Sequence, residues 1–389
     1  MRITGTRQGL LVTNLSGEMA YRSFRPAPLQ SVVPLALPDE CQLLLSTCAR
    51  KLGELSGMAR FVPNANMYLT MYVRKEALLS AQIEGTQCTF DDVLDPANQQ
   101  LVHQDVSEVI SYINALLYAE ERMKSFPLCT RLLKEVHSRL LKGTRGEEKT
   151  PGEVRVSQNW IGPAGCVLRE APYIPPNVDD MAQALGDLDL FINNGAGLDP
   201  IVKAALIHYQ FETIHPFLDG NGRLGRLLIT LSLINDGVLP GAVFYPSYQL
   251  KVRRGEYYER LTRVREEGDY EGWVAFFGSC MLASAEDAID SMRRLVDVHR
   301  SAEGVIKQSL GKNLSNGLRL LDVAEEHPIL DVSLVIERLG VSRSTATNLI
   351  KTFCELGILH QRDAERQRYR TYVFEDYLSI LRTGGEPLE

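Results

Sequence analysis

The residues best suited to chemistry lie in one short stretch, HPFLDGNGRLGR, at positions 215–226. His215 precedes a proline, which disfavours helical backbone at the residue before it, so we predict that a helix ends there. The DGNG sequence that follows is typical of a turn, because Gly and Asn tolerate positive φ. A second helix should begin at Asn221 or Gly222, and its unpaired N–H groups and positive dipole end form a binding site for phosphate.

Four side chains around this predicted helix start could act on a phosphate. Arg223 and Arg226 fall in its first turn, where each exposed cation opposes the helix dipole by about 0.3–1 kcal/mol and therefore needs an anionic partner such as a polyphosphate. Asp219 would be ionised in such a positive pocket and could share Mg²⁺ with the phosphate oxygens. His215 stands directly before the loop as a general base. For His208, seven residues earlier on a similar helix face, we expect only a structural role.

The chain that must position these residues has 389 residues, 44% of them hydrophobic and 23% charged, which is ordinary globular composition. At about 150 residues per domain, this length indicates two or three domains. The net charge of -7 excludes a uniformly basic nucleic-acid-binding protein, although it permits one small basic module. The 7 cysteines are scattered and form no CxxC pair, which indicates reduced thiols and neither a zinc site nor a disulfide framework.

The start of the chain and its hydropathy indicate a location. The N-terminal segment lacks the apolar core of a signal peptide, and no run approaches the roughly 18 apolar residues of a membrane span. We therefore expect a soluble, cytoplasmic protein with no membrane partner, which agrees with the reduced cysteines.

Helical periodicity dominates the chain between Pro38 and about residue 300. Apolar residues recur there at mixed spacings of three and four, which is typical of amphipathic helices. Residues 1–37 show no such pattern and are expected to form an irregular arm. A strand-like stretch, a GPAG turn and a second extended stretch predict one hairpin at about 155–170, the only β element expected before the C-terminal region.

The stretch at 215–226 resembles the signature of the Fic/Doc family at every defined position, and the surrounding segments agree from about residue 60 to 280. In such enzymes the histidine removes the proton from a Ser, Thr or Tyr hydroxyl of a target protein, which attacks the α-phosphate of ATP and takes up AMP. The resemblance implies that His215 is the base and that Asp219 is the Mg²⁺ ligand.

The same resemblance implies a set of contacts with ATP. Asn221 would contact the α-phosphate, and Arg223 and Arg226 would hold the β- and γ-phosphates. Gly220 and Gly222 would supply backbone N–H groups. The implied ATP-binding set is Gly220, Asn221, Gly222, Arg223, Leu224, Gly225, Arg226 and Tyr248.

Residues 80–85, SAQIEG, resemble the inhibitory motif (S/T)xxxE(G/N) of Fic proteins. Gly85 suits the position after a helix end, so Glu84 falls in the last turn, where a carboxylate faces the negative dipole end and needs a cationic partner. The resemblance implies that Glu84 pairs with Arg226 and occupies the γ-phosphate position, with Ser80 bonding nearby. Without that partner, Glu84 would be an ordinary solvated residue. It could also align a water molecule that removes AMP from a modified target.

Two further segments resemble family features. The hairpin at 155–170 resembles the flap, with which a target segment pairs as an added strand, and the alternative is an ordinary edge hairpin. The segment after residue 241 resembles the one behind the adenine, with Tyr248 and Tyr257 or Tyr258 in the pocket. The spacing from Tyr248 to the Tyr257–Tyr258 pair is one residue longer than usual, and the customary Asn between them is absent. These aromatics could instead be core residues, and the base preference of the nucleotide pocket stays open.

The last eighty residues are expected to form a separate unit, which resembles a winged helix-turn-helix. Ser342 fits the N-cap of its second helix. Residues 338–372 hold seven Lys/Arg and three Asp/Glu, which permits DNA binding but equally a protein-docking or dimer module. The candidate DNA contacts are Arg343, Ser344, Thr345 and Asn348 on the recognition helix and Arg366, Arg368 and Arg370 in the wing.

We therefore predict a mainly α protein, with a Fic-fold helical core, a small β-hairpin flap and a C-terminal winged helix-turn-helix domain. The expected regions are an N-terminal helical region with the inhibitory helix (1–100), the Fic catalytic core (101–300) and the winged-helix domain (311–389). The leading hypothesis is a protein adenylyltransferase that is inhibited by Glu84 and takes ATP and Mg²⁺ as ligands. Its expected partners are a target protein with a hydroxyl side chain, docked on the flap, and a second copy of the chain in a homodimer. The alternatives are a DNA-binding regulator whose core senses nucleotide, and an enzyme that removes AMP or transfers another phosphate-containing group.

Overall fold

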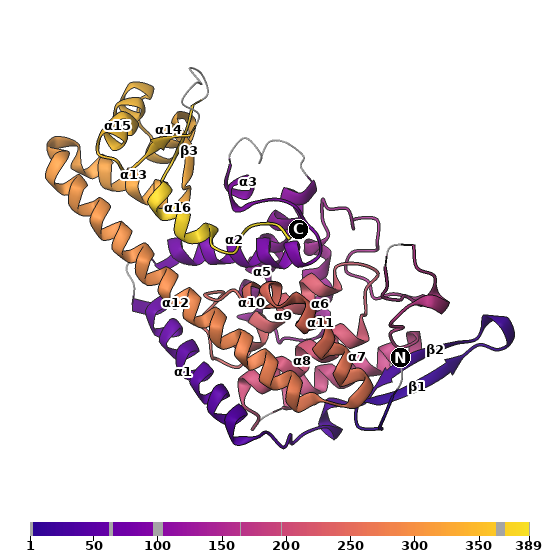
Figure 1. The fold of residues 1–389 in the computed structure, drawn as a ribbon. Coiled ribbons are helices and arrows are strands. Elements are labelled where there is room, and N and C mark those ends of the chain that lie inside the picture. Colours follow the sequence, from indigo (N-terminus) through magenta and orange to yellow (C-terminus); the bar gives the residue numbers. More distant parts are fainter. Residues whose placement is uncertain are drawn as a thin grey trace.

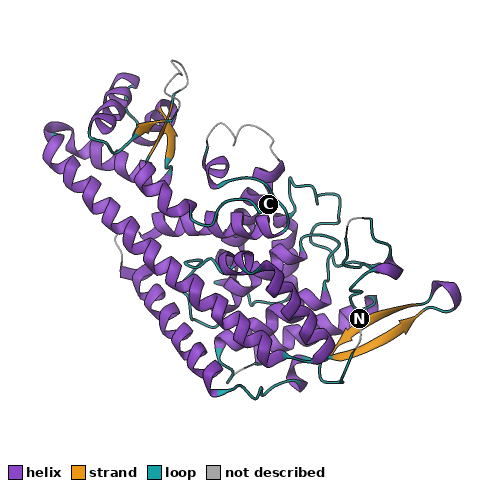
Figure 2. Cartoon of the chain, viewed as in Figure 1, coloured by secondary structure: helices purple, strands orange, loops and turns teal. Residues whose placement is uncertain are grey.

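The computed structural model describes residues 3–61, 65–95, 104–163, 165–195, 197–362 and 370–388. Helices build most of the molecule, and its strands lie at two opposite ends (Figure 2). The helices that precede the C-terminal module are α1 (Asp39–Phe61), α2 (Ala65–Ile83), α3 (Phe90–Leu94), α5 (Gln104–Met123), α6 (Thr130–Leu140), α7 (Val178–Asn194), α8 (Pro200–Ile214), α9 (Asn221–Asn235), α10 (Ser247–Val252), α11 (Arg254–Glu267) and α12 (Tyr270–Ser309).

The centre of the fold is the pair α8 and α9, which pack against each other. The start of α8 is fixed by Pro200 at its first position and by the Asp199 carboxylate, which accepts hydrogen bonds from two N–H groups of the first turn. Every residue from 201 to 214 is buried. A helix that is buried on all sides belongs in a core, so the loop that joins α8 to α9 is held firmly at both ends.

Longer helices enclose this centre (Figure 1). α12 has 40 residues and runs along one side of the molecule, where α1 packs beside it. α2 packs against α5 and α10, and it also contacts α9. The predicted inhibitory residues lie at the end of α2, so the fold brings them to the central pair.

The expectation of an irregular N-terminal arm is wrong between residues 9 and 26. Strands β1 (Gly9–Asn14) and β2 (Tyr21–Pro26) form an antiparallel hairpin in which Gly9 pairs with Pro26 and Asn14 with Tyr21. The hairpin is supported from outside, because the N–H of Phe24 donates to the carbonyl of Ile174, 2.9 Å away. Such support from a distant segment leaves no periodic signal in the sequence.

The segment predicted as a flap hairpin folds back on itself between residues 154 and 176. Its two arms meet at one antiparallel bridge, Ile161 with Tyr173, and Leu168–Glu170 form a 3₁₀ turn. The described part of this segment contains no further strand pairing. It is therefore a looped flap with a single bridge instead of two regular strands. We call residues 154–176 the flap segment.

The C-terminal module contains α13 (Leu314–Glu326), β3 (Ile329–Asp331), α14 (Val332–Leu339), α15 (Arg343–Glu355), β4 (His360–Gln361), β5 (Thr371–Val373) and α16 (Glu375–Arg382). The strands form an antiparallel sheet in the order β3-β5-β4. Gly340 adopts a φ of 67° between α14 and α15, as a tight turn requires, and the Ser342 side chain caps α15. The prediction of a mainly α protein with a C-terminal winged helix-turn-helix is confirmed. The predicted wing residues Arg366 and Arg368 lie outside the described residues.

This module is joined to the helical core by more than its chain connection. Its buried residues continue the hydrophobic core of the other helices. The Arg382 guanidinium pairs with Asp91 of α3 at 2.7 Å, and the Gln82 amide of α2 donates to the carbonyl of Gly385 at 2.8 Å. The C-terminal module thus packs against the helical core, a contact that sequence periodicity does not show. Of the helices in the described ranges, none combines the length and hydropathy that a bilayer span requires.

Candidate active site

The loop after α8 is shaped by a left-handed residue, His215, at φ 48° and ψ 61°. A residue with a Cβ adopts this conformation at a cost of about 1–2 kcal/mol, so the surroundings must hold it. The Asn221 side chain closes the loop: its Oδ1 accepts from the N–H of Phe217 at 2.9 Å and its Nδ2 donates to the carbonyl of Phe217 at 2.8 Å. Asn221 therefore acts first on the shape of the loop.

The first backbone N–H groups of α9 have no acceptor within the helix, as at any helix start. Gly220 precedes the helix at φ 72°, a conformation that favours glycine. At Gly222, a Cβ would collide with the carboxylate of Glu84. Gly220 is therefore favoured by its backbone angle, whereas a side chain at position 222 would push the Glu84 carboxylate away from its present place.

A cavity of about 410 Å³ opens over this helix start. It gathers residues from four separate parts of the chain, including most of the predicted site. Its lining residues are Glu84, Gly85, Glu108, Arg145, His215, Leu218, Asp219, Gly220, Asn221, Gly222 and Arg223.

Several residues predicted for the site lie outside this lining. Leu224 and Gly225 are buried in the body of α9, and Arg226 lies behind Glu84. Tyr248 belongs to α10, where its ring packs against Tyr245 and the ammonium group of Lys75. Among the two other candidate tyrosines, Tyr257 is fully buried, whereas Tyr258 is 41% exposed.

The pair of Glu84 and Arg226 that the resemblance implies is present. The Nη2 atom of Arg226 lies 2.7 Å from Oε1 of Glu84, and its Nε donates to the Ser80 hydroxyl at 2.9 Å. Gly85 follows the end of α2 at φ 100°. Burial raises the pKa of Glu84, but the charge and hydrogen bond of Arg226 outweigh it and hold this pKa below its ordinary value. Glu84 is therefore ionised at neutral pH and neutralises an arginine whose side chain is only 1% exposed.

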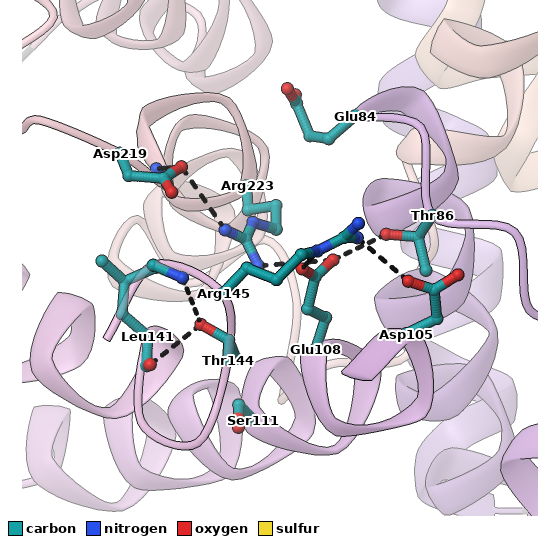
Figure 3. A network of polar contacts seen from close by, with 12 residues as sticks. Glu84, Thr86, Asp105, Glu108, Ser111, Leu141, Thr144, Arg145, Asp219 and Arg223 are labelled. Atoms are coloured by element: carbon teal, nitrogen blue, oxygen red, sulfur yellow. Dashed lines mark hydrogen bonds and ion pairs between the residues drawn. The ribbon is translucent and has the colours of Figure 1, made fainter. Parts of the chain in front are cut away.

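A second polar network lines the other side of the cavity (Figure 3). The Glu108 carboxylate of α5 accepts from Nε of Arg145 at 2.8 Å and from the Thr86 hydroxyl at 2.7 Å. Arg223 reaches it less closely, with Nη1 3.9 Å from Oε2. Arg145 also bonds Asp105 at 3.0 Å. Glu108 thus links the loop after Glu84 to the first arginine of α9.

Arg223 is only partly paired in this network. Its other contact with a carboxylate joins Nη2 to Oδ1 of Asp219 at 3.7 Å. The side chain is 5% exposed, and its Nε and Nη1 have no hydrogen-bond partner among the described residues. Buried donors that lack partners are costly, so the site is suited to an anion with several oxygens.

Sequence reasoning missed Glu108, Arg145 and His137. The available signal for Glu108 was a carboxylate on the buried face of α5, next to Val106 and Val109. His137 lies beneath the loop: its Nε2 is 3.0 Å from the carbonyl of Asp219 and its ring stacks on Phe217. Arg145 had no comparable signal, because it lies in a polar loop.

The imidazole of His215 is suited to accept a proton. Burial, and then the positive charge of Arg265, lower its pKa to about 4. The ring is therefore neutral at pH 7. His208 differs in function: its Nδ1 is 2.8 Å from the carbonyl of Gly225 and its Nε2 2.9 Å from the Tyr257 hydroxyl, in agreement with the structural role expected for it.

A metal ion would find one protein carboxylate here. Asp219 faces the cavity with 43% of its side chain exposed. The part of the chain that the structure describes contains no group of three or more His, Cys, Asp and Glu side chains that could hold a metal alone. This donor set fits Mg²⁺, which takes one or two carboxylates and completes its shell with phosphate and water oxygens.

Comparison with known proteins gives matches for three parts of the chain. Residues 43–121 match the Fic/DOC family N-terminal model, residues 127–233 the Fic/DOC family model and residues 313–363 the IclR helix-turn-helix domain. The chain is 28% identical over 220 residues to "Protein adenylyltransferase Fic" of Drosophila ananassae, which covers 55% of this chain and 39% of that protein. It is 32% identical over 173 residues to the protein of the same name from Drosophila willistoni. That match covers 44% of this chain and 30% of the Drosophila protein. The chain thus spans less than half the length of these relatives.

The fold is shared with a solved structure. The crystal structure of a Fic family protein from Desulfovibrio desulfuricans G20 superposes with a TM-score of 0.55 and 20% sequence identity. The superposition covers 88% of this chain and 97% of that one. It therefore extends the likeness beyond the two matched Fic segments to most of the molecule.

Proposed function

We propose that this chain, which belongs to the Fic/DOC family, transfers AMP from ATP to a hydroxyl group of a target protein. The observation that carries the proposal is the cavity at the start of α9, where a neutral His215, the Asp219 carboxylate and the unsatisfied Arg223 face one another. The names of the Drosophila relatives support the same activity.

In the proposed reaction, the target hydroxyl oxygen attacks the α-phosphorus and the bond to the β-phosphate oxygen breaks. His215 takes the hydroxyl proton, and pyrophosphate leaves with the released electron pair. The N–H groups at the start of α9 and the guanidinium groups of Arg223 and Arg226 would hold the phosphates. Phosphoryl-type transfer depends mainly on such positioning and charge neutralisation. Mg²⁺ beside Asp219 would neutralise phosphate charge when bound.

Glu84 would act as a brake on this reaction. Its carboxylate occupies the space beside Arg226, where the γ-phosphate would need the same guanidinium donors. Two anions cannot share one buried arginine without repulsion, so ATP in the reactive pose must displace Glu84. The target protein would dock on the flap segment, which exposes Val156, Trp160 and Val167 to solvent.

Incubation with ATP labelled at either the α- or the γ-phosphate tests the activity. The Glu84→Gly variant, which lacks the proposed brake, is mixed with Mg²⁺ and a cytosolic lysate, and label on protein is followed on gels. We expect label from the α position only. Label from the γ position would instead show phosphoryl transfer, and release of AMP from a modified target without any labelling would show AMP removal. Either of these outcomes would contradict the proposal.

The C-terminal module supports a second function, DNA binding. Arg343, Ser344 and Asn348 are exposed on α15, as a recognition helix requires. The hydroxyls of Ser344 and Thr345 each lie 2.9 Å from the hydroxyl of the Ser342 cap. We expect the full chain to bind duplex DNA more weakly as salt rises, and Arg343→Ala to reduce both affinity and salt dependence. Fluorescence anisotropy with labelled duplexes measures both, with Lys124→Ala, far from the module, as control. No binding at low salt would instead favour a protein-docking role.

A further inference from the structure

Two side chains of the flap segment converge on the main-chain carbonyl of His215. The Nε atom of Arg155 donates to it at 3.1 Å and the Nδ2 atom of Asn159 at 3.2 Å. The same Asn159 nitrogen also reaches the carbonyl of Phe217 at 3.1 Å. The left-handed turn at His215 is therefore held by hydrogen bonds from the flap segment as well as by bonds within its own loop.

Arg155 also ties both ends of the flap segment to this turn. Its Nη1 donates to the carbonyl of Ser157 at 3.2 Å and its Nη2 to that of Pro176 at 2.5 Å. Its main-chain N–H donates to the carbonyl of Pro216 at 2.9 Å. One residue thus joins the start of the flap segment, its end and the backbone on both sides of the His215–Pro216 bond.

The surroundings of Arg155 are unusual for an arginine. The residue is 1% exposed, and no carboxylate of the described residues forms an ion pair with it. Burial lowers its pKa to about 10, so it remains charged at neutral pH. Burial of a charge costs free energy unless its donors find acceptors. Here Nε, Nη1 and Nη2 of Arg155 each donate to a main-chain carbonyl. The buried guanidinium therefore serves to hold these main-chain carbonyls in fixed positions relative to one another.

We propose that Arg155 is a positioning residue for the transfer reaction, which fixes the left-handed turn at His215 relative to the flap segment. This inference rests on the proposed function. In that reaction the flap segment holds the target hydroxyl and His215 receives its proton, so the two must keep one geometry. The planar fork of a guanidinium can bond three carbonyls in different directions at once, whereas a lysine ammonium at the end of a flexible chain cannot reproduce this arrangement.

In the proposed reaction the phosphates would be held by the start of α9, Arg223 and Arg226, and not by Arg155. Loss of the Arg155 side chain should therefore affect the proton acceptor and spare the nucleotide. It should also change the titration of His215, since the positive charge of Arg155 adds to burial and to Arg265 in lowering the pKa of that ring.

The test compares Arg155→Ala and Arg155→Lys in a Glu84→Gly background. Arg139→Ala is the control, because Arg139 is half-buried and also donates to a main-chain carbonyl, that of Glu135 at 3.0 Å, outside the cavity. Three quantities are measured in each variant: the Kd for ATP by calorimetry, the rate of AMP transfer, and the pKa of His215 by NMR, assigned by its loss in His215→Ala.

For Arg155→Ala we expect a rate about 10²-fold lower, because a misplacement of about 1 Å costs that much, with an unchanged Kd for ATP. The pKa of His215 should rise, and added guanidinium ion should restore part of the rate. Arg155→Lys keeps the charge but should melt below the parent, because buried carbonyls lose a donor, and it should still lose most of the rate.

A Kd for ATP that rises as much as the rate falls, or an equal loss in Arg139→Ala, would show a merely structural role and overturn the inference. If the Glu84→Gly parent transfers no AMP, the proposed function fails, yet the geometry held by Arg155 can still be tested. Backbone NMR shifts of His215 and Phe217 that are the same in Arg155→Ala as in its parent would then contradict the positioning role, because the turn would keep its shape without this side chain.

Discussion

Replacement of Glu84 by glycine should raise the rate of AMP transfer at low ATP concentration by about 10²-fold. Removing one partner of a buried ion pair typically changes free energies by about 3–5 kcal/mol. Here only Arg226 is fully buried and Glu84 is 39% exposed, which places the expected gain at the lower end of that range. The gain should appear mainly as a lower Kd for ATP, because the variant leaves the donors of Arg226 free for the γ-phosphate.

The measurement combines ATP calorimetry with transfer rates over a range of ATP concentrations. Glu84→Gln is the matched variant, since it keeps the size of the side chain and removes its charge, and it should lie between wild type and Glu84→Gly. Glu121→Gly, at an exposed helical position far from the cavity, controls for the backbone effect of glycine. Equal Kd values in wild type and Glu84→Gly would remove the brake from the proposal.

The same substitution should have an opposite effect on stability. Without Glu84, the buried Arg226 keeps its hydrogen bonds to Ser80 but loses its ion-pair partner. The ligand-free variant should therefore melt below the wild-type protein, and ATP should raise its melting temperature by more than it raises that of wild type.

The site residues that could be predicted from the sequence are those that lie together in one continuous stretch. The loop from His215 to Arg226 carries its own local signals: a proline after the helix end, glycines at the turn and arginines in the next helix. The pairing of Glu84 with Arg226 bridges 142 positions and could be expected only through the family resemblance. Nothing in the spacing of residues would have joined them.

The residues that escaped prediction act through the backbone or through distant partners. Arg155 and Asn159 bond main-chain carbonyls, and a carbonyl group is the same in every residue, so no side-chain pattern marks its partner. Arg145 and Glu108 come from separate segments that meet only in the folded chain. The N-terminal hairpin depends likewise on the flap segment, through the hydrogen bond from Phe24 to Ile174.

In the fold, too, elements with local sequence signals could be predicted and contacts between distant segments could not. Core helices such as α8 and α9 are long and strongly apolar, and their existence follows from local sequence. The packing of α16 and the last residues against α2 and α3 depends on single polar contacts, such as that of Arg382 with Asp91. Contacts of this kind are set by the assembled surfaces and are not encoded in any one segment.

His215→Ala should reduce AMP transfer by about 10²–10⁴-fold, the usual contribution of a general base, while ATP binding stays unchanged. The imidazole acts on the attacking hydroxyl, whereas the phosphates are held by α9 and the two arginines. Both effects should be measured in the Glu84→Gly background, where ATP can bind. The loss should be the same across neutral and mildly acidic pH, because a ring with a pKa of about 4 is already neutral there.

The matched variant His215→Asn keeps a polar side chain of smaller size in the left-handed position, which asparagine tolerates well. It should lose transfer as fully as His215→Ala, since its amide cannot accept the proton at neutral pH. If His215→Asn kept the parent rate, His215 would serve only to shape the loop. If His215→Ala lost ATP binding together with transfer, the ring would be part of the phosphate site. A selective loss of transfer in both variants assigns the proton to His215, because the two share only the absence of the imidazole.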